Sequence, residues 1–346
     1  MFFKKKRAIG LDIGSSLVKM VELSPGKSPN LVNYGVARIL PDAIVDGEIM
    51  DREVVLDSIR DLIQSRSFST KNVIFGVSGH GVIIKRLVMD RMSERETSDQ
   101  IRWEAEQHIP FDIDEVSIDY EIVNPEFGEN QQEVLLVAAK KEFINSWTAL
   151  LSEVGLNTVA VDATAIALQN VFEYSYQPSE TATVALIHMG MATTVINVVR
   201  GGVSLLARDI FFGLNNFITR LQRELGLNYE DSVAAMKGAL PSGTTKESVG
   251  TVFNSFADEI IGQVERSIHF LSSVGGEQKI DKLYLSGGGS LVFNMTELFQ
   301  RRFDLPTERL RPLTGFEYDP AIFGGEDVDE VGALLAPALG YALRGE

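Results

Sequence analysis

Three glycine-containing turns carry the residues whose types and spacing could do chemistry in this chain of 346 residues. In the first turn, Gly14, Ser15 and Ser16 separate two apolar segments, 8–13 and 17–23, that we predict to be strands. The side chains of this turn are small, so its successive backbone N–H groups can converge on an anion such as a phosphate. The pattern therefore indicates a phosphate-binding hairpin.

Two charged residues flank this first turn. Asp12 could hold a hydrated Mg²⁺, because magnesium prefers one or two carboxylates together with waters and phosphate oxygens. Lys19 lies among apolar residues and needs either a partner or an exit to water. A bound phosphate would be that partner. The alternative is an ordinary edge hairpin with a solvated lysine, since Asp-x-Gly-Ser is a common pattern.

The third turn in chain order lies near the C-terminal end. There, Gly287, Gly288 and Gly289 follow a predicted strand at 283–285 and precede a predicted helix at 293–303. Glycine allows close backbone approach, and a helix N-terminus favours negative charge, so this turn could cradle a phosphate or a ribose. Such turns also occur without ligands. Neither the Gly-x4-Gly-Lys-Ser/Thr spacing nor Gly-x-Gly-x-x-Gly after a first strand is present, so neither a P-loop nor a Rossmann fingerprint is predicted.

The second turn in chain order lies between these two, and its sequence is similar to that of the first. The segment 187–192, I-H-M-G-M-A, resembles 11–16, L-D-I-G-S-S, and each lies between two apolar strands. The two segments are about half a chain apart. This spacing favours two similar lobes that are related by duplication.

Composition and charge exclude several classes of protein. Hydrophobic residues make up 45% of the chain and charged residues 23%, which excludes a disordered or fibrous chain. The net charge of −16 argues against a broad surface for nucleic acid or anionic lipid. Without cysteine there is no disulfide, thiolate metal site or cysteine nucleophile, which fits the cytoplasm. The most apolar stretch, 183–199, is too interrupted to span a membrane.

The basic segment 1–7 has two interpretations: a solvated terminus, or a weak electrostatic foothold on a membrane or a partner. Secretion is not predicted, because no clean apolar run follows it. A linker is expected at 175–181.

Apolar periodicity predicts an α/β protein in which strands and helices are mixed along the chain. Ser93 and Glu96 form a capping-box pattern at the start of one helix, and Asp162 could cap another. The predicted helices lie at 51–65, 93–108, 142–154, after residue 162, and at 214–224, 229–237, 253–273, 293–303 and 331–343. The predicted strands are 8–13, 17–23, 32–39, 73–77, 83–89, 121–123, 134–139, 159–161, 183–188, 194–199 and 283–285.

The order of the three turns, hairpin, hairpin and strand-to-helix, resembles the actin-like ATPase superfamily. Within it the chain is similar to the PilM family of type IV pilus assembly proteins, itself similar to the cell-division protein FtsA. The matching segments are A-I-G-L-D-I-G-S-S-L-V-K at 8–19, R-W-E-A-E-Q-H-I-P-F-D-I-D-E-V at 102–116, L-S-G-G-G-S at 285–290 and L-G-Y-A-L-R-G at 339–345. The resemblance covers nearly the whole chain, and the second segment separates this family from other actin-like proteins.

The resemblance implies an α/β actin-like ATPase fold, with two lobes around a nucleotide cleft and a subdomain inserted in the first lobe. The first-lobe core would be 1–84 with 155–174 and 331–346. The inserted subdomain would be 85–154, and the second lobe 175–330.

The resemblance also implies ATP with Mg²⁺ as the ligand of this cleft. Asp12 would hold the metal through water, and Asp162 matches the acid that orients the attacking water in related ATPases. Gly213 would lie near the ribose and Lys237 near the nucleoside. The implied nucleotide-binding residues are Asp12, Gly14, Ser15, Ser16, Lys19, Gly190, Met191, Ala192, Thr193, Gly213, Lys237, Gly287, Gly288 and Gly289.

Two departures from the family pattern weaken the expectation of hydrolysis. The second phosphate loop of relatives usually begins Asp-Ile-Gly, but here His188 stands in place of the acid. The acid expected three residues before Lys237 is replaced by Ala234. We interpret His188 as a packed or neutral substitute, since no other histidine or carboxylate lies at metal-ligand spacing.

As a function, the resemblance implies a cytoplasmic ATP-binding adaptor, peripheral at the inner membrane through its partner. It would grip the N-terminal cytoplasmic peptide of PilN in a groove between the first-lobe core and the inserted subdomain, alongside other type IV pilus inner-membrane components. ATP would close the lobes and change this groove. Trp103 and Phe111 would either pack internally or line it.

Two alternatives stay open from the sequence. One is an active ATPase or small-molecule kinase, for which Asp162 is the candidate base. The other is a membrane filament like FtsA, which would need a C-terminal amphipathic helix, but 332–346 lacks the basic polar face of such helices.

Overall fold

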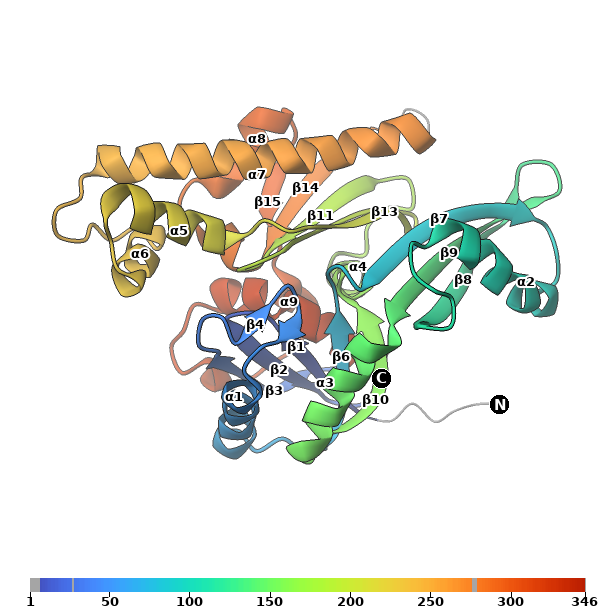
Figure 1. The fold of residues 1–346 in the computed structure, drawn as a ribbon, viewed down its shortest axis with the longest axis horizontal. Helices are drawn as coiled ribbons and strands as arrows, with labels where there is room; N and C mark the ends of the chain where they lie inside the picture. The colour runs from blue at the N-terminus through green and yellow to red at the C-terminus, as the bar shows by residue number, and fades with distance from the viewer. Residues whose placement is uncertain (1–6, 27, 276–278, 346) are drawn as a thin grey trace.

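The structure is a computed structural model that describes residues 7–26, 28–275 and 279–345. Two lobes lie one above the other in Figure 1, and a smaller subdomain projects to the right from the lower one. Each lobe contains one five-stranded sheet, and the subdomain contains a three-stranded sheet. The positions of the three glycine turns follow from the order of strands in these sheets.

The first-lobe sheet has the order β10-β6-β1-β2-β3. The strands β1, β2 and β3 form an antiparallel meander, and β6 and β10 continue the sheet in parallel with β1. The strands are β1 Ile9–Ile13, β2 Leu17–Leu23, β3 Leu31–Arg38, β6 Asn72–Val77 and β10 Asn157–Ala163. A small hairpin, β4 Ile44–Val45 and β5 Glu48–Ile49, lies between β3 and β6.

The second-lobe sheet repeats this arrangement in the order β15-β14-β11-β12-β13. Again three strands form an antiparallel meander and two follow in parallel with the first of them. The strands are β11 Thr183–Met189, β12 Thr194–Arg200, β13 Val203–Ile210, β14 Lys282–Ser286 and β15 Thr307–Arg309. The prediction of two similar lobes is confirmed by this shared topology, while their origin by duplication stays a prediction.

The predicted helices are present, most with ends shifted by a few residues. They are α1 Arg52–Ser65, α2 Glu94–His108, α3 Lys141–Glu153, α4 Thr164–Tyr176, α5 Leu214–Leu225, α6 Tyr229–Met236, α7 Lys246–Gly275, α8 Met295–Phe303 and α9 Val328–Arg344. The capping box of Ser93 and Glu96 is confirmed at the start of α2. Within the described residues, no helix combines the length and the apolar character that a membrane crossing requires.

Several strands differ from the prediction. The strands β4, β5, β13 and β15 were not predicted, and the inserted hairpin strands β8 Val116–Phe127 and β9 Gln131–Lys140 are longer than expected. Along β8, exposed charged residues such as Asp119 and Glu121 alternate with half-buried ones. A half-exposed strand of this kind lacks the apolar run on which the prediction relied.

Two expectations about helix starts were wrong. Asp162 does not cap α4: the N-cap is Ala163, and the Asp162 carboxylate accepts from the Ala163 N–H and from Arg344. The glycine run does not lead directly into α8 either. It continues into a 3₁₀ turn, Gly288–Leu291, and α8 begins only at Met295.

Helices α4 and α9 lie between the two sheets and join the lobes. One apolar cluster contains Leu168 of α4 and Leu339 of α9 together with Val21 of the first sheet and Leu186 of the second. Figure 1 shows α9 between the upper and lower lobes. A Cβ on Gly340 of α9 would lie 2.0 Å from the carbonyl oxygen of Ala167, so the two helix backbones are almost in contact.

The inserted subdomain has a sheet of its own, in the order β7-β9-β8, with β7 at Val82–Asp90. Helix α2 packs Ile101 and Ala105 on one face of this sheet in a separate apolar cluster. Trp147 of the following helix α3 packs instead with the first-lobe core. The domain boundaries given above remain a prediction.

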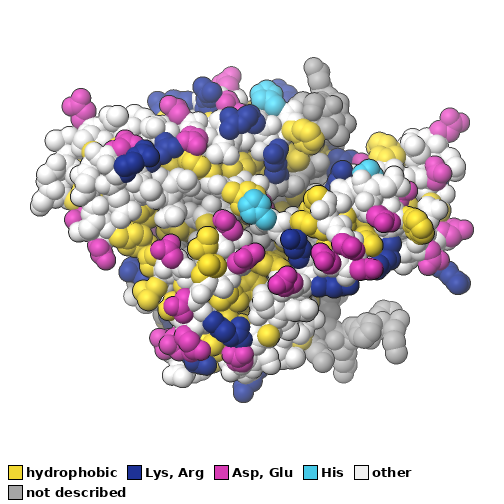
Figure 2. Space-filling view, viewed as in Figure 1, with side chains coloured by type: hydrophobic (Ala, Val, Ile, Leu, Met, Phe, Trp, Pro, Cys, Tyr) yellow, Lys and Arg dark blue, Asp and Glu magenta, His cyan; other side chains and the backbone are white. Residues whose placement is uncertain are grey.

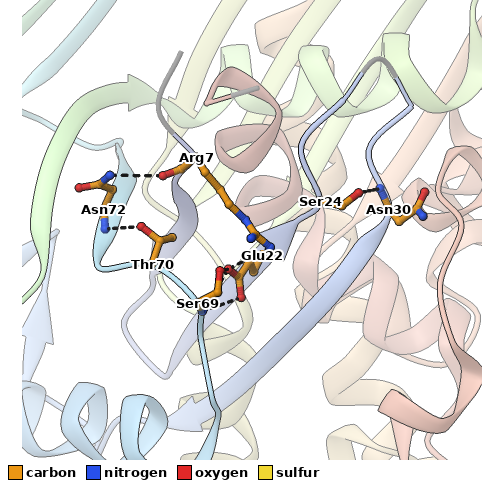
Figure 3. A network of polar contacts seen from close by, with 7 residues as sticks. All are labelled: Arg7, Glu22, Ser24, Asn30, Ser69, Thr70 and Asn72. Atoms are coloured by element: carbon orange, nitrogen blue, oxygen red, sulfur yellow. Dashed lines mark hydrogen bonds and ion pairs between the residues drawn. The ribbon is translucent and has the colours of Figure 1, made fainter. Parts of the chain in front are cut away.

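A polar network holds the start of the chain to the first lobe (Figure 3). Glu22 is only 1% exposed, and its carboxylate accepts from the backbone N–H of Ser69 at 3.1 Å and from the Ser69 hydroxyl. The Arg7 guanidinium lies 3.3 Å from the same carboxylate, so the buried charge is compensated. The two interpretations of the basic terminus fall on residues 1–6, which lie outside the described residues.

We predict that Gly340→Ala destabilises the protein, because the added methyl group would collide with the backbone of α4. Overpacking of this kind costs about 2 kcal/mol or more and should lower the melting temperature by several degrees. The matched control is Gly250→Ala in α7, where an added Cβ meets nothing within 4 Å. The control should leave stability unchanged or raise it by up to about 1 kcal/mol. Equal melting temperatures for the two variants would contradict the prediction.

Candidate functional site

The first turn is closed by its own backbone, since Gly14 N–H donates to the carbonyl of Leu17 at 2.9 Å. Asp12 and Lys19 face each other across the hairpin of β1 and β2. Their side chains form an ion pair of 2.6 Å and are 14% and 9% exposed. Lys19 Nζ also lies 3.5 Å from the point where a Cβ on Gly14 would be. A cation with a carboxylate partner therefore lies next to the turn.

The second turn is built in the same way but carries different side chains. Gly190 N–H donates to the carbonyl of Thr193 at 2.9 Å. In place of the Asp12–Lys19 pair, the equivalent positions of this hairpin hold His188 and Val195, which face each other across β11 and β12. The two lobes thus share a turn but not its charges.

Helix α5 packs its first turn on the second turn. Leu214 N–H donates to the carbonyl of Gly190 at 3.1 Å, and Asn215 N–H to that of Met191 at 2.8 Å. Gly213 makes this approach possible, because a Cβ there would lie 2.5 Å from the Met191 oxygen. Gly190, Met191 and Gly213 are therefore brought together.

The third turn packs on the second lobe at the end of β11. Gly287 has a φ of +75°, and a Cβ there would lie 2.5 Å from the carbonyl oxygen of Met189. A Cβ on Gly289 would lie 2.4 Å from the Met189 Cβ. Gly287 N–H donates to the carbonyl of Ala333 in α9 at 2.9 Å. Glycine is therefore required here for packing, whatever ligand the turn binds.

His188 links the turns of the two lobes. Its Nδ1 lies 3.0 Å from the Ser286 hydroxyl, beside the third turn. Burial lowers the pKa of His188 to about 4, Asp12 raises it and Lys19 lowers it further. The imidazole is therefore neutral at physiological pH. The charges of the first hairpin therefore act on a side chain of the second hairpin, which lies in the other lobe.

These side chains fit a polyanionic ligand. Lys19 supplies a cation, and the backbone N–H groups of the first two turns other than those of Gly14 and Gly190, which close the hairpins, can face an anion. They fit a divalent cation less completely. Asp12 is the carboxylate that faces the turns, and no group of three or more histidine or acidic side chains in the described part of the chain could hold a metal ion. A metal at Asp12 would depend on waters and phosphate oxygens for its other ligands.

Asp162 pairs with Arg344 rather than with Asp12 or Lys19. One carboxylate oxygen accepts from Arg344 of α9 at 2.9 Å, and the other, buried oxygen has no hydrogen-bond partner in the described residues. Burial raises the pKa of Asp162, Arg344 lowers it and Asp119 of β8 raises it. Asp12 and Lys19 are not among these influences. The role of Asp162 as a water-orienting acid remains a prediction that this geometry does not support.

Lys237 and the remaining loop residues also stay predictions. Lys237 is exposed at the C-terminal end of α6, where its backbone N–H caps the helix. Ser15, Ser16, Ala192 and Thr193 lie in their turns as expected from the sequence.

A second polar region lies between the inserted sheet and the first lobe. Asp119 on β8 raises the pKa of Asp162, and Glu121, two residues along the same strand, raises that of Glu173 in α4. The charges of these two β8 residues therefore act on carboxylates of the first lobe across the junction. Figure 2 shows Asp and Glu side chains over the subdomain and its junction with the first lobe. We call the space that these four carboxylates flank the acidic groove.

Trp103 and Phe111 do not behave as a pair. Trp103 is 71% exposed on α2, whose buried residues Ile101 and Ala105 face the sheet, so it does not pack internally. Phe111 is half-buried against the core of the subdomain, with Lys140 Nζ 4.7 Å from its ring. Because α2 covers the face of the sheet opposite Asp119 and Glu121, Trp103 lies away from the acidic groove.

The roles of several of these residues could not be recognised from the sequence. Arg344 was part of a quoted motif, but nothing indicated its partner. Asp209 of β13, which contacts Gly79 across the lobes, gave no signal because its strand was not predicted. Asp119 lies outside the predicted strand 121–123 and Glu121 begins it, so the sequence indicated no role for either residue. Alternation along 116–122 was the one signal that could have revealed the longer strand.

Two lobes of the same topology, with glycine turns facing across a cleft and two helices joining the sheets, define an actin-like fold. Solved structures agree. The chain is similar to the ethanolamine utilization protein EutJ from Carboxydothermus hydrogenoformans (13% identity, TM-score 0.57, 97% of this chain and 89% of that one). It is also similar to MreB 5 of Spiroplasma citri bound to AMPPNP (14%, TM-score 0.52, 98% and 95%). At these identities the likeness shows the fold alone.

The particular family follows from two further comparisons. The family model described as type IV pilus assembly protein PilM matches residues 10–346. A structure described as the PilM-PilN type IV pilus biogenesis complex is similar at 25% identity, with a TM-score of 0.87 over 99% of both chains. The chain belongs to the PilM family of type IV pilus assembly proteins.

We predict that His188→Asp makes nucleotide binding more dependent on Mg²⁺. The substitution places a second carboxylate opposite Asp12, and two carboxylates hold magnesium better than one. The ratio of ATP affinities with Mg²⁺ and with EDTA, measured by calorimetry, should rise about tenfold, or ~1.4 kcal/mol. His188→Asn, a neutral side chain of similar polarity, is the control and should leave the ratio near that of the parent protein. An unchanged ratio in His188→Asp would contradict this prediction.

Proposed function

We propose that the protein is a cytoplasmic, nucleotide-binding adaptor of the type IV pilus inner-membrane assembly complex. It is held at the inner membrane by its partner rather than by direct insertion. The partner is the N-terminal cytoplasmic peptide of PilN, and other inner-membrane components of the pilus machinery assemble around the pair. Family membership and the likeness to the PilM-PilN complex support this proposal.

The acidic groove is the observation that carries the proposal. Asp162 is buried with one carboxylate oxygen unpartnered, and Arg344 and the Ala163 N–H stabilise its charge while Asp119 opposes it. A buried carboxylate oxygen without a donor is costly, so a cationic or hydrogen-bond-donating group entering the groove would be stabilised there. A basic peptide has this chemistry.

Strand edges favour the same kind of ligand. β8 is the outer strand of the inserted sheet, and β10 is the outer strand of the first-lobe sheet. Asp119, whose charge raises the pKa of Asp162, belongs to β8, and Asp162 belongs to β10. An extended peptide can pair with the backbone groups of such an edge while its side chains meet the carboxylates.

In the cleft, the proposed ligand is ATP. Lys19 and the backbone N–H groups of the turns hold the phosphates, and Asp12 holds a hydrated Mg²⁺ that offsets phosphate charge. We propose that hydrolysis is weak or absent, because His188 replaces the second carboxylate and Asp162 is engaged with Arg344. An active ATPase or a small-molecule kinase is not favoured, since either needs a carboxylate base in the cleft.

The nucleotide part of the proposal predicts that Lys19→Met weakens ATP binding. Loss of the cation beside the first turn leaves the Asp12 carboxylate facing the phosphates, so the affinity should fall at least about tenfold, or ~1.4 kcal/mol. Lys71→Met, at an exposed lysine just before β6, should bind ATP like the parent protein. Calorimetry in Mg²⁺ buffer measures both. Equal affinities in the two variants would remove the support for this site.

The partner part predicts that charge reversal on β8 weakens peptide binding. Asp119→Lys with Glu121→Lys should lower the affinity for a fluorescein-labelled PilN N-terminal peptide by about tenfold or more, because like charges then meet in the groove. The binding of the parent protein should weaken as salt rises. Glu129→Lys, at the exposed turn between β8 and β9, is the control. A parent protein that does not bind the peptide, or a double variant that binds as well, would refute this assignment.

A further inference from the structure

The two lobes touch where the inserted subdomain begins. Gly79, between β6 and β7, donates its N–H to the carboxylate of Asp209 at the end of β13. The next residue, His80, stacks on Phe211 with ring centroids 3.4 Å apart and planes 8° from parallel. We call these two contacts, made by Gly79, His80, Asp209 and Phe211, the interlobe clasp.

The clasp lies at the edge of the packing between the lobes. A cavity of about 300 Å³ lies beside it. Its walls come from both lobes and from the start of β7, and include Val77, Ile84, Thr164 and Ala207. Ile84 and Ala207 also pack against the apolar cluster that joins the lobes, whereas Phe211 is 41% exposed. The clasp therefore lies where solvent and a cavity meet the interlobe packing.

On the second-lobe side, the clasp is directly connected to the cleft. Asp209 faces Val195 across β13 and β12, and β12 begins at Thr194, at the end of the second turn. The Thr194 hydroxyl donates to the carbonyl of Phe212 at 2.8 Å. Gly213, which packs on the second turn, is the next residue. A shift of the second turn is thus transmitted to Asp209 through one strand pair.

On the other side, the clasp holds the root of the inserted sheet. The carbonyl of Gly79 accepts from Val82 N–H at 3.0 Å, at the first residue of β7. The carbonyl of Gly81 accepts from Lys140 N–H at 2.9 Å, at the end of β9. Since β8 pairs with β9 along its length, the position of this root sets the position of Asp119 and Glu121 in the acidic groove.

The chemistry of Asp209 makes the contact selective. Burial raises the pKa of Asp209 to about 6, and the Gly79 N–H and His80 lower it, so the carboxylate is mostly ionised at physiological pH. Loss of its donor destabilises a desolvated carboxylate, because hydrogen bonds to charged groups contribute more to stability than hydrogen bonds between neutral groups. The clasp therefore favours one arrangement of the two lobes.

From this geometry we infer that the interlobe clasp couples the nucleotide cleft to the partner groove, with Asp209, His80 and Phe211 as positioning residues. The inference rests on the proposed function and goes further by assigning the residues through which one ligand influences the other. Nucleotide that favours the clasped arrangement changes the peptide affinity, and by linkage the peptide changes the nucleotide affinity by the same factor.

The test is this coupling factor, measured in both directions on the full-length protein. The affinity for the labelled PilN N-terminal peptide is determined with and without saturating AMPPNP and Mg²⁺, and the affinity for AMPPNP with and without the peptide. The parent protein should show a factor of about fivefold or more, the same in both directions. Asp209→Ala and Phe211→Ala should each reduce it below about twofold, while the affinity for each ligand alone stays within about twofold.

Two controls separate coupling from folding. Asp209→Asn keeps an acceptor for the Gly79 N–H and should retain more of the coupling than Asp209→Ala. Leu240→Ala, at an exposed residue elsewhere in the second lobe, should retain all of it. The melting temperatures of these variants should lie within a few degrees of the parent.

The outcomes distinguish this inference from the proposed function. Variants that keep the parent coupling, or that weaken peptide binding equally with and without nucleotide, overturn the clasp as a coupling element. A parent protein that binds both ligands without coupling also overturns it, while the adaptor proposal stands. If the parent binds neither ligand, both fall.

Discussion

The near-contact of α4 and α9 is the constraint on which the arrangement of the two lobes depends. Both helices lie between the sheets, and Gly340 allows the backbone of one to meet that of the other at Ala167. The carbonyl of Ala333 in α9 accepts from Gly287 in the third turn, and the C-terminal Arg344 of the helix pairs with Asp162 beside the acidic groove. One helix therefore relates the cleft to the groove, and the clasp provides a second connection on the other side.

The cleft has the geometry of a nucleotide site but an uneven distribution of charge. Lys19 and Asp12 lie in the first lobe as an ion pair, whereas His188 in the second is buried and neutral. Backbone groups can hold phosphates without side-chain charge, but hydrolysis needs groups that activate water and offset developing charge. This asymmetry is the reason for proposing a protein that responds to nucleotide rather than consumes it.

Local patterns in the sequence predicted much of the fold, and long-range pairs could not be predicted. Asp12 and Lys19 are seven positions apart, so their spacing in the sequence indicated that both flank the same turn. The Asp162–Arg344 pair joins residues 182 positions apart, and the Asp209–Gly79 contact joins residues 130 apart. Nothing in the neighbourhood of such a charge shows whether it is solvated or paired. Asp162 was therefore expected to serve the cleft, and Asp209 was not considered.

The duplicated hairpins also bear on how a ligand would leave. In the equivalent positions of the two hairpins, Asp12 and Lys19 correspond to His188 and Val195. The first hairpin therefore carries an ion pair at these positions and the second does not. On the proposed function, a phosphate chain would lose backbone contacts on one side when the lobes part but would keep its Coulombic attachment on the other. Its departure would then be a separate kinetic event from lobe opening, and an opened molecule could close again on the ligand that it already carries.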